Sequence, residues 1–494
     1  MSYWIGIDIG TGGSRALLID AAGKIVAAVT EPHAEMTMQR PLWAEQDPDD
    51  WWRAAAKAIR GVLREANLAG SEVKGVGLSG QMHGLVLLDD EGKVIRPSLI
   101  WCDQRSQTQV DAINAKATPA KVLECTANPV LTGFTLPKLL WVRDNEPANY
   151  ERGRMMLLPK DYIRFKLTGD YATEVSDASG TALFDVVKRD WSYELAGIVG
   201  VDRSMLPRCH ESSDVTGSIN TEAADETGLM AGTPVVGGGG DQAASAVGNG
   251  IVKAGIVSCT IGTSGVVFGH MEEPAYDPEG RVHTFCHAVK GKWHGMGVTQ
   301  GAGLSLQWLR NQLTPGMDYD AMTAEAATAP AGAEGLYWLP YLMGERTPHL
   351  DSTARAAWVG LTAKHKRADM IRSVLEGVAY SQMDCLEILE GLGTKVASVR
   401  LSGGGAKSPF WRQMFADVFG KRVVTLETQE GSAYGAALLA AVGTGEYADV
   451  PEACAATVRE VSAVDPGAIA AVYAHGHKVY QSIYPALKEV YGKL

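Results

Sequence analysis

The sequence PVVGGGGDQAA at residues 234–244 combines a short apolar run, four glycines and a single acid. Val235 and Val236 are β-branched and predict a buried strand. The glycines let the backbone adopt unusual dihedral angles and let another molecule approach the main chain closely. Asp241 then begins a run of small residues that predicts a helix. This carboxylate is either an N-cap, which Asp often forms, or a catalytic group above a bare glycine surface.

A strand-and-turn element occurs twice in the chain. Residues 5–13 read IGIDIGTGG and residues 257–265 read VSCTIGTSG, and each continues into a second apolar strand. This repeat indicates two domains of the same design that face each other. The hydroxyl and NH groups of such turns suit phosphate oxygens. The turn residues concerned are Thr11, Gly12, Gly262 and Thr263.

Asp8 lies inside the first copy, in an otherwise apolar strand. An acid in such a strand is costly to bury unless it is paired or binds a cation. The second copy has Thr260 at the matching position, so a role that needs an acid belongs to the first domain. We predict that Asp8 lies beside a metal ion and phosphate, and a turn-capping role is the alternative.

The length of 494 residues exceeds what one ordinary core organises and predicts two domains, which we place at 1–245 and 246–494. We expect the final helix, at about 469–494, to pack back on the first domain. The net charge of −12 and the lack of a basic tract argue against nucleic acid or a membrane surface as partner. Without a leader, a membrane span or a CxxC motif, a cytoplasmic protein with reduced thiols is expected.

Two further segments, LSGQMHG and WCDQR, place polar side chains where a predicted strand ends. Such positions commonly line a pocket. His83 and Asp103 are therefore candidates for contacts with a ligand that carries several hydroxyl groups. The alternatives are an ordinary turn with a surface histidine and a simple ion pair between Asp103 and Arg105.

A second strand-glycine-helix element lies at residues 399–411 and has no acid at its end. It suits a flat group lying on bare backbone, such as adenine with its ribose. Ser408 predicts an N-cap for the helix that follows, with Pro409 at the first position. The candidate nucleotide-binding residues here are Gly403, Gly404, Gly405 and Ser408.

These elements together predict a nucleoside triphosphate in a cleft between two related domains. Phosphoryl transfer requires in-line positioning, charge neutralisation by Mg2+ and a base for the attacking hydroxyl. Asp241 is the candidate base and Asp8 the candidate on the metal side. The sequence has no GxxxxGK[ST] pattern, so the protein is not a P-loop enzyme.

Nine segments, in order along nearly the whole chain, resemble the FGGY family of carbohydrate kinases. They are IGIDIGTGGSRA (5–16), LSGQMHG (78–84), WCDQR (101–105), LLPKDYIRFKLTG (157–169), SDASGT (176–181), GGGGDQAA (237–244), IGTSG (261–265), YLMGERTPH (341–349) and LSGGGAKSPFWRQMFADVFG (401–420).

The resemblance implies an α/β protein with two ribonuclease-H-like (actin-like ATPase) domains flanking a central cleft that holds ATP and a sugar. It implies Asp241 as proton acceptor and Asp8 as the acid near Mg2+ and phosphate. Met82 and His83 would contact the sugar. Further implied sugar contacts are Asp103, Asp241 and Gln242, where family members often have Asn in place of Gln242. The nucleotide would be held by Gly262, Thr263, Gly403, Gly404 and Gly405.

The segments QMHG, WCDQR and KDYIRFKLTG favour D-xylulose as the acceptor implied by the resemblance, phosphorylated on its terminal hydroxyl. Another acceptor, such as ribulose, an alditol or glycerol, is the nearest alternative. An actin- or Hsp70-like ATPase that moves a protein partner is the alternative of another class. The sequence leaves the oligomeric state open, with a homodimer as one option.

Overall fold

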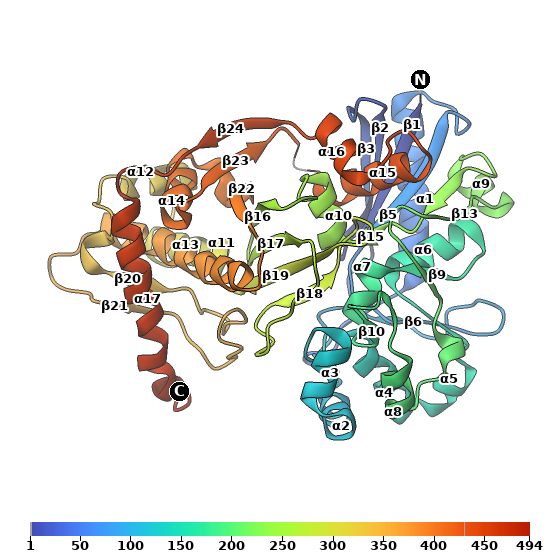
Figure 1. Ribbon diagram of the computed structural model, residues 1–494, viewed down its shortest axis with the longest axis horizontal. Coiled ribbons are helices and arrows are strands. Elements are labelled where there is room, and N and C mark those ends of the chain that lie inside the picture. Colours follow the sequence, from blue (N-terminus) through green and yellow to red (C-terminus); the bar gives the residue numbers. More distant parts are fainter. Residues whose placement is uncertain (1, 429) are drawn as a thin grey trace.

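The structure is a computed structural model that describes residues 2–428 and 430–494. It has two lobes, each built around a seven-stranded mixed sheet with helices packed on it (Figure 1). The first sheet has the order β13-β14-β5-β1-β2-β3, with β15 paired to β5, and the second has the order β18-β19-β17-β16-β22-β23-β24. The strands of the first sheet are β1 (Tyr3–Ile9), β2 (Gly13–Asp20), β3 (Ile25–Pro32), β5 (Val73–Gly80), β13 (Val215–Ser218), β14 (Pro234–Val236) and β15 (Gly239–Gly240). Those of the second are β16 (Gly255–Ile261), β17 (Gly265–Met271), β18 (His283–Cys286), β19 (Trp293–Thr299), β22 (Val396–Gly403), β23 (Arg422–Leu426) and β24 (Glu460–Val464).

The two sheets repeat one topology, as the sequence repeat predicts. In the first, β1, β2 and β3 form an antiparallel meander, β5 and β14 follow in parallel, and β13 closes the sheet antiparallel to β14. In the second, β16, β17 and β19 form the meander, β22 and β23 follow in parallel, and β24 is antiparallel to β23. This is the ribonuclease-H-like architecture, present twice, and the predicted fold is confirmed.

The parallel strands bring their carboxyl ends to one edge of each sheet. Asp8 on β1 pairs with Ser79 on β5, and Gly239 on β15 pairs with the same Ser79 from the other side. In the second sheet, Ile261 on β16 pairs with Gly403 on β22. Ligands of open α/β sheets bind beyond such carboxyl ends. The sheet topology therefore explains why the predicted site residues lie at the carboxyl ends of the parallel strands.

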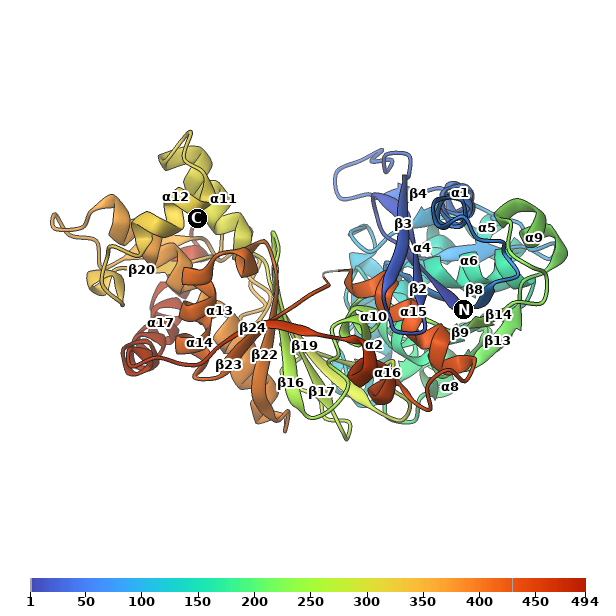
Figure 2. The same ribbon diagram turned by 90° about the horizontal axis from the view of Figure 1, so that it is seen from above.

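Helix α15 (Gly431–Gly443) comes from the second half of the chain but packs on the first sheet, mainly against β1 and β5 (Figure 2). A Cβ on Gly6 or Gly77 would lie 1.8 or 1.9 Å from a carbonyl oxygen of α15. Gly435 of α15 makes an equally close approach to α10 (Asp241–Gly248). The small residues of α15 thus allow backbones to pack closely, and a division of the chain at 245/246 does not account for this contact.

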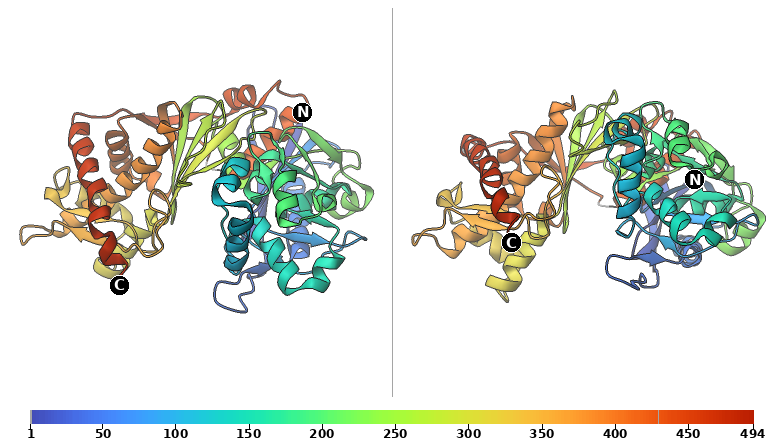
Figure 3. Two further views of the ribbon diagram at one scale, coloured as in Figure 1. Left: turned by 60° about the horizontal axis from the view of Figure 1, so that its bottom comes forward. Right: turned by 90° about the horizontal axis from the view of Figure 1, so that it is seen from below.

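The expectation that the final helix packs on the first domain is wrong. Helix α17 (Ala470–Tyr491) packs on α13 (Arg367–Gly391), α14 (Pro409–Phe419) and β20 (Tyr337–Leu339) in the second lobe, and Figure 3 shows it there. Its tyrosines Tyr473 and Tyr480 are fully buried in the core of that lobe. The burial of these tyrosines in the second lobe determines where the helix packs.

The remaining elements complete the lobes. The other helices are α1 (Pro48–Ala66), α2 (Gln107–Ala117), α3 (Pro119–Thr126), α4 (Thr135–Asn145), α5 (Pro147–Arg152), α6 (Pro159–Thr168), α7 (Val175–Ala178), α8 (Tyr193–Val199), α9 (Thr221–Thr227), α11 (Ala302–Leu313), α12 (Tyr319–Ala326) and α16 (Val450–Thr457). Short 3-10 helices are η1 (Ser179–Thr181), η2 (Arg203–Met205), η3 (Ala333–Gly335) and η4 (Gly404–Lys407). Short strands are β4 (Glu45–Gln46), β6 (Val86–Leu88), β7 (Ser98–Leu99), β8 (Met155–Leu157), β9 (Ala172–Glu174), β10 (Phe184–Asp185), β11 (Asp190–Trp191), β12 (Arg208–His210) and β21 (Ala357–Val359). None of the helices in the described part of the chain has the length and apolar character needed to cross a bilayer.

Candidate active site

Asp241 is the first residue of α10 and directly follows β15. The N-cap of this helix is Gly240, so the N-cap interpretation of Asp241 is wrong. Burial raises the pKa of Asp241 to about 7, and the negative charge of Asp8 adds to the rise, while hydrogen bonds from Gln242 oppose it. A carboxylate with a pKa near neutrality is well suited to accept a proton from a hydroxyl group.

Asp8 lies at the carboxyl end of β1. Burial raises the pKa of Asp8, and the neighbouring Ser79 hydroxyl and the charge of Arg15 lower it. Its Oδ1 is buried and has no hydrogen-bond partner among the residues that the structure describes. The turn after β1 is closed by the backbone bond from Gly10 N to Gly13 O, so Asp8 is not needed as a cap. An unpaired carboxylate oxygen of this kind fits a hard cation.

Met82 and His83 lie just after β5, next to the residue that precedes Asp241. A Cβ on Gly240 would lie 3.0 Å from Met82 Cγ and Sδ, so the Met82 side chain packs directly against Gly240. His83 Nδ1 is 2.7 Å from the carbonyl oxygen of Gly180. Because a carbonyl only accepts, this nitrogen carries the hydrogen.

The remaining ring nitrogen of His83 is an acceptor. Burial lowers the pKa of His83 to about 3, and the positive charges of Lys138 and Arg346 act in the same direction. The ring is therefore neutral at physiological pH. With its hydrogen on Nδ1, it offers the lone pair of Nε2 to a ligand hydroxyl.

Lys138 holds this loop in place, and the sequence reasoning missed it. Its Nζ donates to the carbonyl oxygens of His83, at 2.8 Å, and Gly133, at 2.6 Å. Phe134 stacks on the His83 ring with centroids 4.7 Å apart. His83 itself has a φ of 69°, which non-glycine residues seldom adopt. A lysine inside the apolar run TLPKLLWV is the signal that could have identified it.

Asp103 is not brought into the site. Its carboxylate forms an ion pair with Arg105 at 2.7 Å and accepts from the backbone NH of Ala44 at 2.7 Å. The residue is fully buried. The ion-pair alternative for Asp103 and Arg105 is the one that the structure contains.

The turn after β1 is linked to Gln81, next to the Met82–His83 loop, and to Trp101, the first residue of the WCDQR segment. The Thr11 hydroxyl donates to Gln81 Oε1 at 3.3 Å and accepts from Trp101 Nε1 at 3.0 Å. Gly12 is exposed, and a Cβ on it would meet nothing within 4 Å. The turn therefore has open space beside its backbone.

The second lobe contains a cavity of about 580 Å³ at the ends of β16 and β22. Of the predicted nucleotide-binding residues it includes Gly262, Thr263, Gly404, Gly405 and Ser408. Ser408 also caps α14 as predicted, since its hydroxyl accepts from the backbone NH of Trp411. Lining residues that the sequence reasoning did not assign to this site include Leu306, Gln307, Tyr319 and Trp411.

Gly403 lies beside this cavity rather than in its lining, and its φ of 79° and the 2.5 Å approach of Ile261 O to a Cβ there require glycine. Asp8 and Asp241 do not line the cavity either. The structure thus places Gly262, Thr263 and the residues at 403–408 in the second lobe, and Thr11, Gly12 and the two acids in the first.

A buried ionic cluster lies behind Asp241 and was also missed. Lys160 Nζ lies 2.6 Å from Asp161 Oδ1, 3.4 Å from Asp177 Oδ2 and 3.5 Å from Glu174 Oε1. Ser176, next to Asp177, accepts from the backbone NH of Gly240 at 3.1 Å. The cluster therefore supports the backbone from which Asp241 extends.

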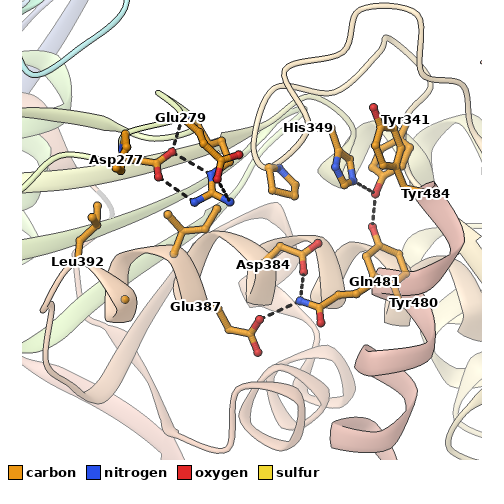
Figure 4. Close-up of a pocket in the computed structure, with 15 residues that line it drawn as sticks. Asp277, Glu279, Tyr341, His349, Asp384, Glu387, Leu392, Tyr480, Gln481 and Tyr484 are labelled. Atoms are coloured by element: carbon orange, nitrogen blue, oxygen red, sulfur yellow. Dashed lines mark hydrogen bonds and ion pairs between the residues drawn. The ribbon is translucent and has the colours of Figure 1, made fainter. Parts of the chain in front are cut away.

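A cavity of about 620 Å³ lies in the second lobe between α13 and α17 (Figure 4). Its acids are paired within it: Gln481 Nε2 donates to Asp384 and Glu387, and His477 Nε2 lies 2.8 Å from Asp384 Oδ1. It contains none of the predicted site residues. Its polar groups satisfy each other, so we do not regard it as the active site.

Comparison with known proteins matches both halves of the chain to one family. Residues 3–248 match the N-terminal domain, and residues 257–444 the C-terminal domain, of the FGGY family of carbohydrate kinases. The chain belongs to this family. It is a carbohydrate kinase, and membership implies ATP and a sugar as substrates together with a divalent metal ion.

Among its relatives are proteins named xylulose kinase. That of Bacillus subtilis (strain 168) is 38% identical, covering 99% of this chain and 97% of the relative. That of Escherichia coli (strain K12) is 39% identical, covering 98% and 99%. Solved structures include xylulose kinase from Rhodospirillum rubrum (30% identity, TM-score 0.94, 99% and 100% covered) and gluconate kinase from Lactobacillus acidophilus (28%, 0.93, 100% and 99%).

Proposed function

We propose that the enzyme transfers the γ-phosphoryl group of ATP to the terminal 5-hydroxyl of D-xylulose and releases D-xylulose 5-phosphate. The observation that carries the proposal is the position of the Met82–His83 loop, which packs against Gly240, the residue before the base. A sugar bound to this loop reaches Asp241 with its other end. The xylulose kinases among the relatives support D-xylulose as acceptor.

The side chains of the first lobe bind and deprotonate the sugar. Asp241 accepts the proton of the attacking hydroxyl as general base. His83 Nε2 accepts a hydrogen bond from a hydroxyl at the far end of the sugar, and Met82 forms an apolar wall. Gln242, next to Asp241 on α10, is a further sugar contact.

The nucleotide binds to glycine-lined backbone on the second lobe, with adenine and ribose in the cavity of about 580 Å³. The NH and hydroxyl groups of the two turns bind phosphate oxygens. The turn and backbone residues concerned are Thr11, Gly12, Gly262, Thr263, Gly403, Gly404 and Gly405, with Ser408 at the cavity wall.

The divalent metal ion is Mg2+, which neutralises phosphate charge when bound. Asp8 would hold it. Its buried and unpaired Oδ1 is the hard oxygen ligand that Mg2+ prefers, and a bound cation would oppose the burial that disfavours the charged carboxylate.

A coupled assay of ATP consumption tests the proposal across D-xylulose, D-ribulose, xylitol, glycerol and gluconate. We expect the highest kcat/KM for D-xylulose and negligible turnover without sugar. A higher value for another acceptor contradicts the choice of D-xylulose, and gluconate is included because one solved relative carries that name. Sugar-independent turnover would favour an ATPase that moves a protein partner.

A homodimer and a cytoplasmic location stay predictions, measurable by sedimentation and fractionation.

A further inference from the structure

Arg346 lies in the connection between β20 and β21 of the second lobe, outside every site that the sequence reasoning predicted. Its backbone is held on both sides. Glu345 Oε1 accepts from the backbone NH groups of Gln300 and Arg346 at 2.8 Å each. Thr347 donates its NH to Val298 O at 3.0 Å and its hydroxyl to Arg281 O at 2.7 Å. These bonds fix Arg346 at the end of the β18–β19 hairpin.

The guanidinium group of Arg346 has no such anchor. It is partly buried, yet it makes no hydrogen bond and no ion pair with any residue in the described part of the chain. Burial lowers the pKa of Arg346. Arginine at such a place usually pairs with a carboxylate, because its five NH donors need acceptors. The donors of Arg346 are therefore available to a ligand.

The β18–β19 hairpin beside Arg346 packs on α7 and η1 of the first lobe, and β18 reaches that lobe in Figure 1. The ring of Phe285 on β18 lies 6.3 Å from the His83 ring. His283 and Phe285 lie 5.8 and 6.3 Å from the Phe134 ring, which in turn stacks on His83. The positive charge of Arg346 helps to lower the pKa of both His83 and His283. Arg346 thus lies near the end of the sugar site where His83 is, and its charge is not among those that shift the pKa of Asp241.

We propose that Arg346 donates hydrogen bonds to the carbonyl oxygen of a ketose acceptor and makes the enzyme select a ketose over the corresponding alditol. This inference rests on the proposed function. Nε2 of His83 only accepts hydrogen bonds, and Arg346 only donates them. Together they match a sugar in which a hydroxyl, which donates to His83, lies next to a carbonyl, which accepts from Arg346. A carbonyl oxygen accepts two hydrogen bonds and offers no proton. A hydroxyl at the same carbon also accepts from a guanidinium group, but it brings a proton that the guanidinium group cannot accept.

The test compares Arg346→Met with Arg422→Met, an exposed arginine on β23 that loses the same charge. We expect Arg346→Met to lower kcat/KM for D-xylulose by about 10- to 100-fold, because a charge-assisted hydrogen bond is lost. The constants for xylitol and D-arabitol, measured as kcat/KM or as inhibition constants, should change by a smaller factor than those for D-xylulose. The KM for ATP should stay unchanged. Arg346→Lys, which keeps a charged donor, should recover part of the loss for D-xylulose.

Equal losses for ketose and alditol, or no loss for the ketose, would overturn the role of Arg346. If Arg346→Met fails to give a cooperative melting transition, the ketose-to-alditol ratio of Arg346→Lys decides, and an unchanged ratio overturns it. The proposed function is tested separately by the wild type. A wild type that does not phosphorylate D-xylulose removes the proposed function, whereas an active wild type with an unchanged ratio in the variants removes only the inference.

Discussion

Asp8 and Asp241 lie at the carboxyl ends of two strands on opposite sides of β5, and the charge of Asp8 raises the pKa of Asp241. Asp8 pairs in register with Ser79, and Gly239, two residues before Asp241, pairs with Ser79 from the other side. Two neighbouring carboxylates at one sheet edge raise each other's pKa, unless a bound cation neutralises the charge or one of them is protonated. This arrangement suits a reaction in which one acid binds a metal ion and the other accepts a proton.

Asp241→Asn is expected to lower turnover by about 10²- to 10⁴-fold, the usual effect of losing a general base. ATP affinity should stay nearly unchanged, because Asp241 does not line the nucleotide cavity. Steady-state kinetics and nucleotide titration measure both, with Asp225→Asn, an exposed acid on α9, as control. A variant with half the wild-type turnover would exclude Asp241 as the base.

The pKa of Asp241, raised from 3.8 to about 7, predicts two opposite pH dependences. The base must be ionised, so kcat/KM for the sugar should rise with pH up to about 7 and then level off. Stability should behave in the reverse way, because the folded state binds the proton more tightly than the unfolded state. Its contribution is fully present below about pH 4 and is lost as pH rises through 7. Asp241→Asn should therefore gain melting temperature relative to wild type at pH 8 but not at pH 4, and equal differences at both pH values would contradict the raised pKa.

Asp8→Ala is expected to lower turnover strongly and to weaken its dependence on Mg2+ concentration. The reason is the loss of the buried carboxylate oxygen that has no protein partner. Activity measured across a Mg2+ titration tests this, with Asp8→Asn as the variant that keeps the shape of the side chain. If both variants retain the wild-type titration and turnover, Asp8 has a structural role only.

His83→Ala is expected to raise the KM for D-xylulose by about 10- to 100-fold, since a lost hydrogen bond to a buried polar group costs roughly 1–3 kcal/mol. The KM for ATP should change little. His83→Asn separates this effect from backbone strain, because Asn tolerates the positive φ of this position better than Ala does. His475→Ala, an exposed histidine on α17, is the control. Unchanged sugar constants in both His83 variants would place the sugar elsewhere.

Sugar binding is expected to close the two lobes. The nucleotide cavity belongs to the second lobe alone, while Asp8 and Asp241 belong to the first, so phosphoryl transfer requires the lobes to approach. Small-angle X-ray scattering should give a smaller radius of gyration with D-xylulose and a nucleotide analogue than without ligands. An unchanged radius with every accepted substrate would count against closure.

Features set by short sequence segments could be predicted, and features set by distant contacts could not. The repeat of strand and Gly-Thr turn led to the duplicated sheet, and Ser408 to the cap of α14, because each depends on neighbouring residues. Lys138 and Asp103 were missed or misplaced for the opposite reason. Their partners, the His83 carbonyl and the Ala44 NH, are 55 and 59 residues away along the chain.

The position of α15 has a consequence for the order in which the protein folds during synthesis. The glycine-lined face of the first sheet, at Gly6 and Gly77, is in direct contact with α15, residues 431–443. A ribosome must therefore translate most of the chain before the N-terminal lobe can finish folding, although N-terminal domains generally fold first. Until then that lobe, with the helix that carries Asp241, is left with an uncovered apolar surface. The first lobe of the nascent chain can therefore finish folding only after α15 has been synthesised.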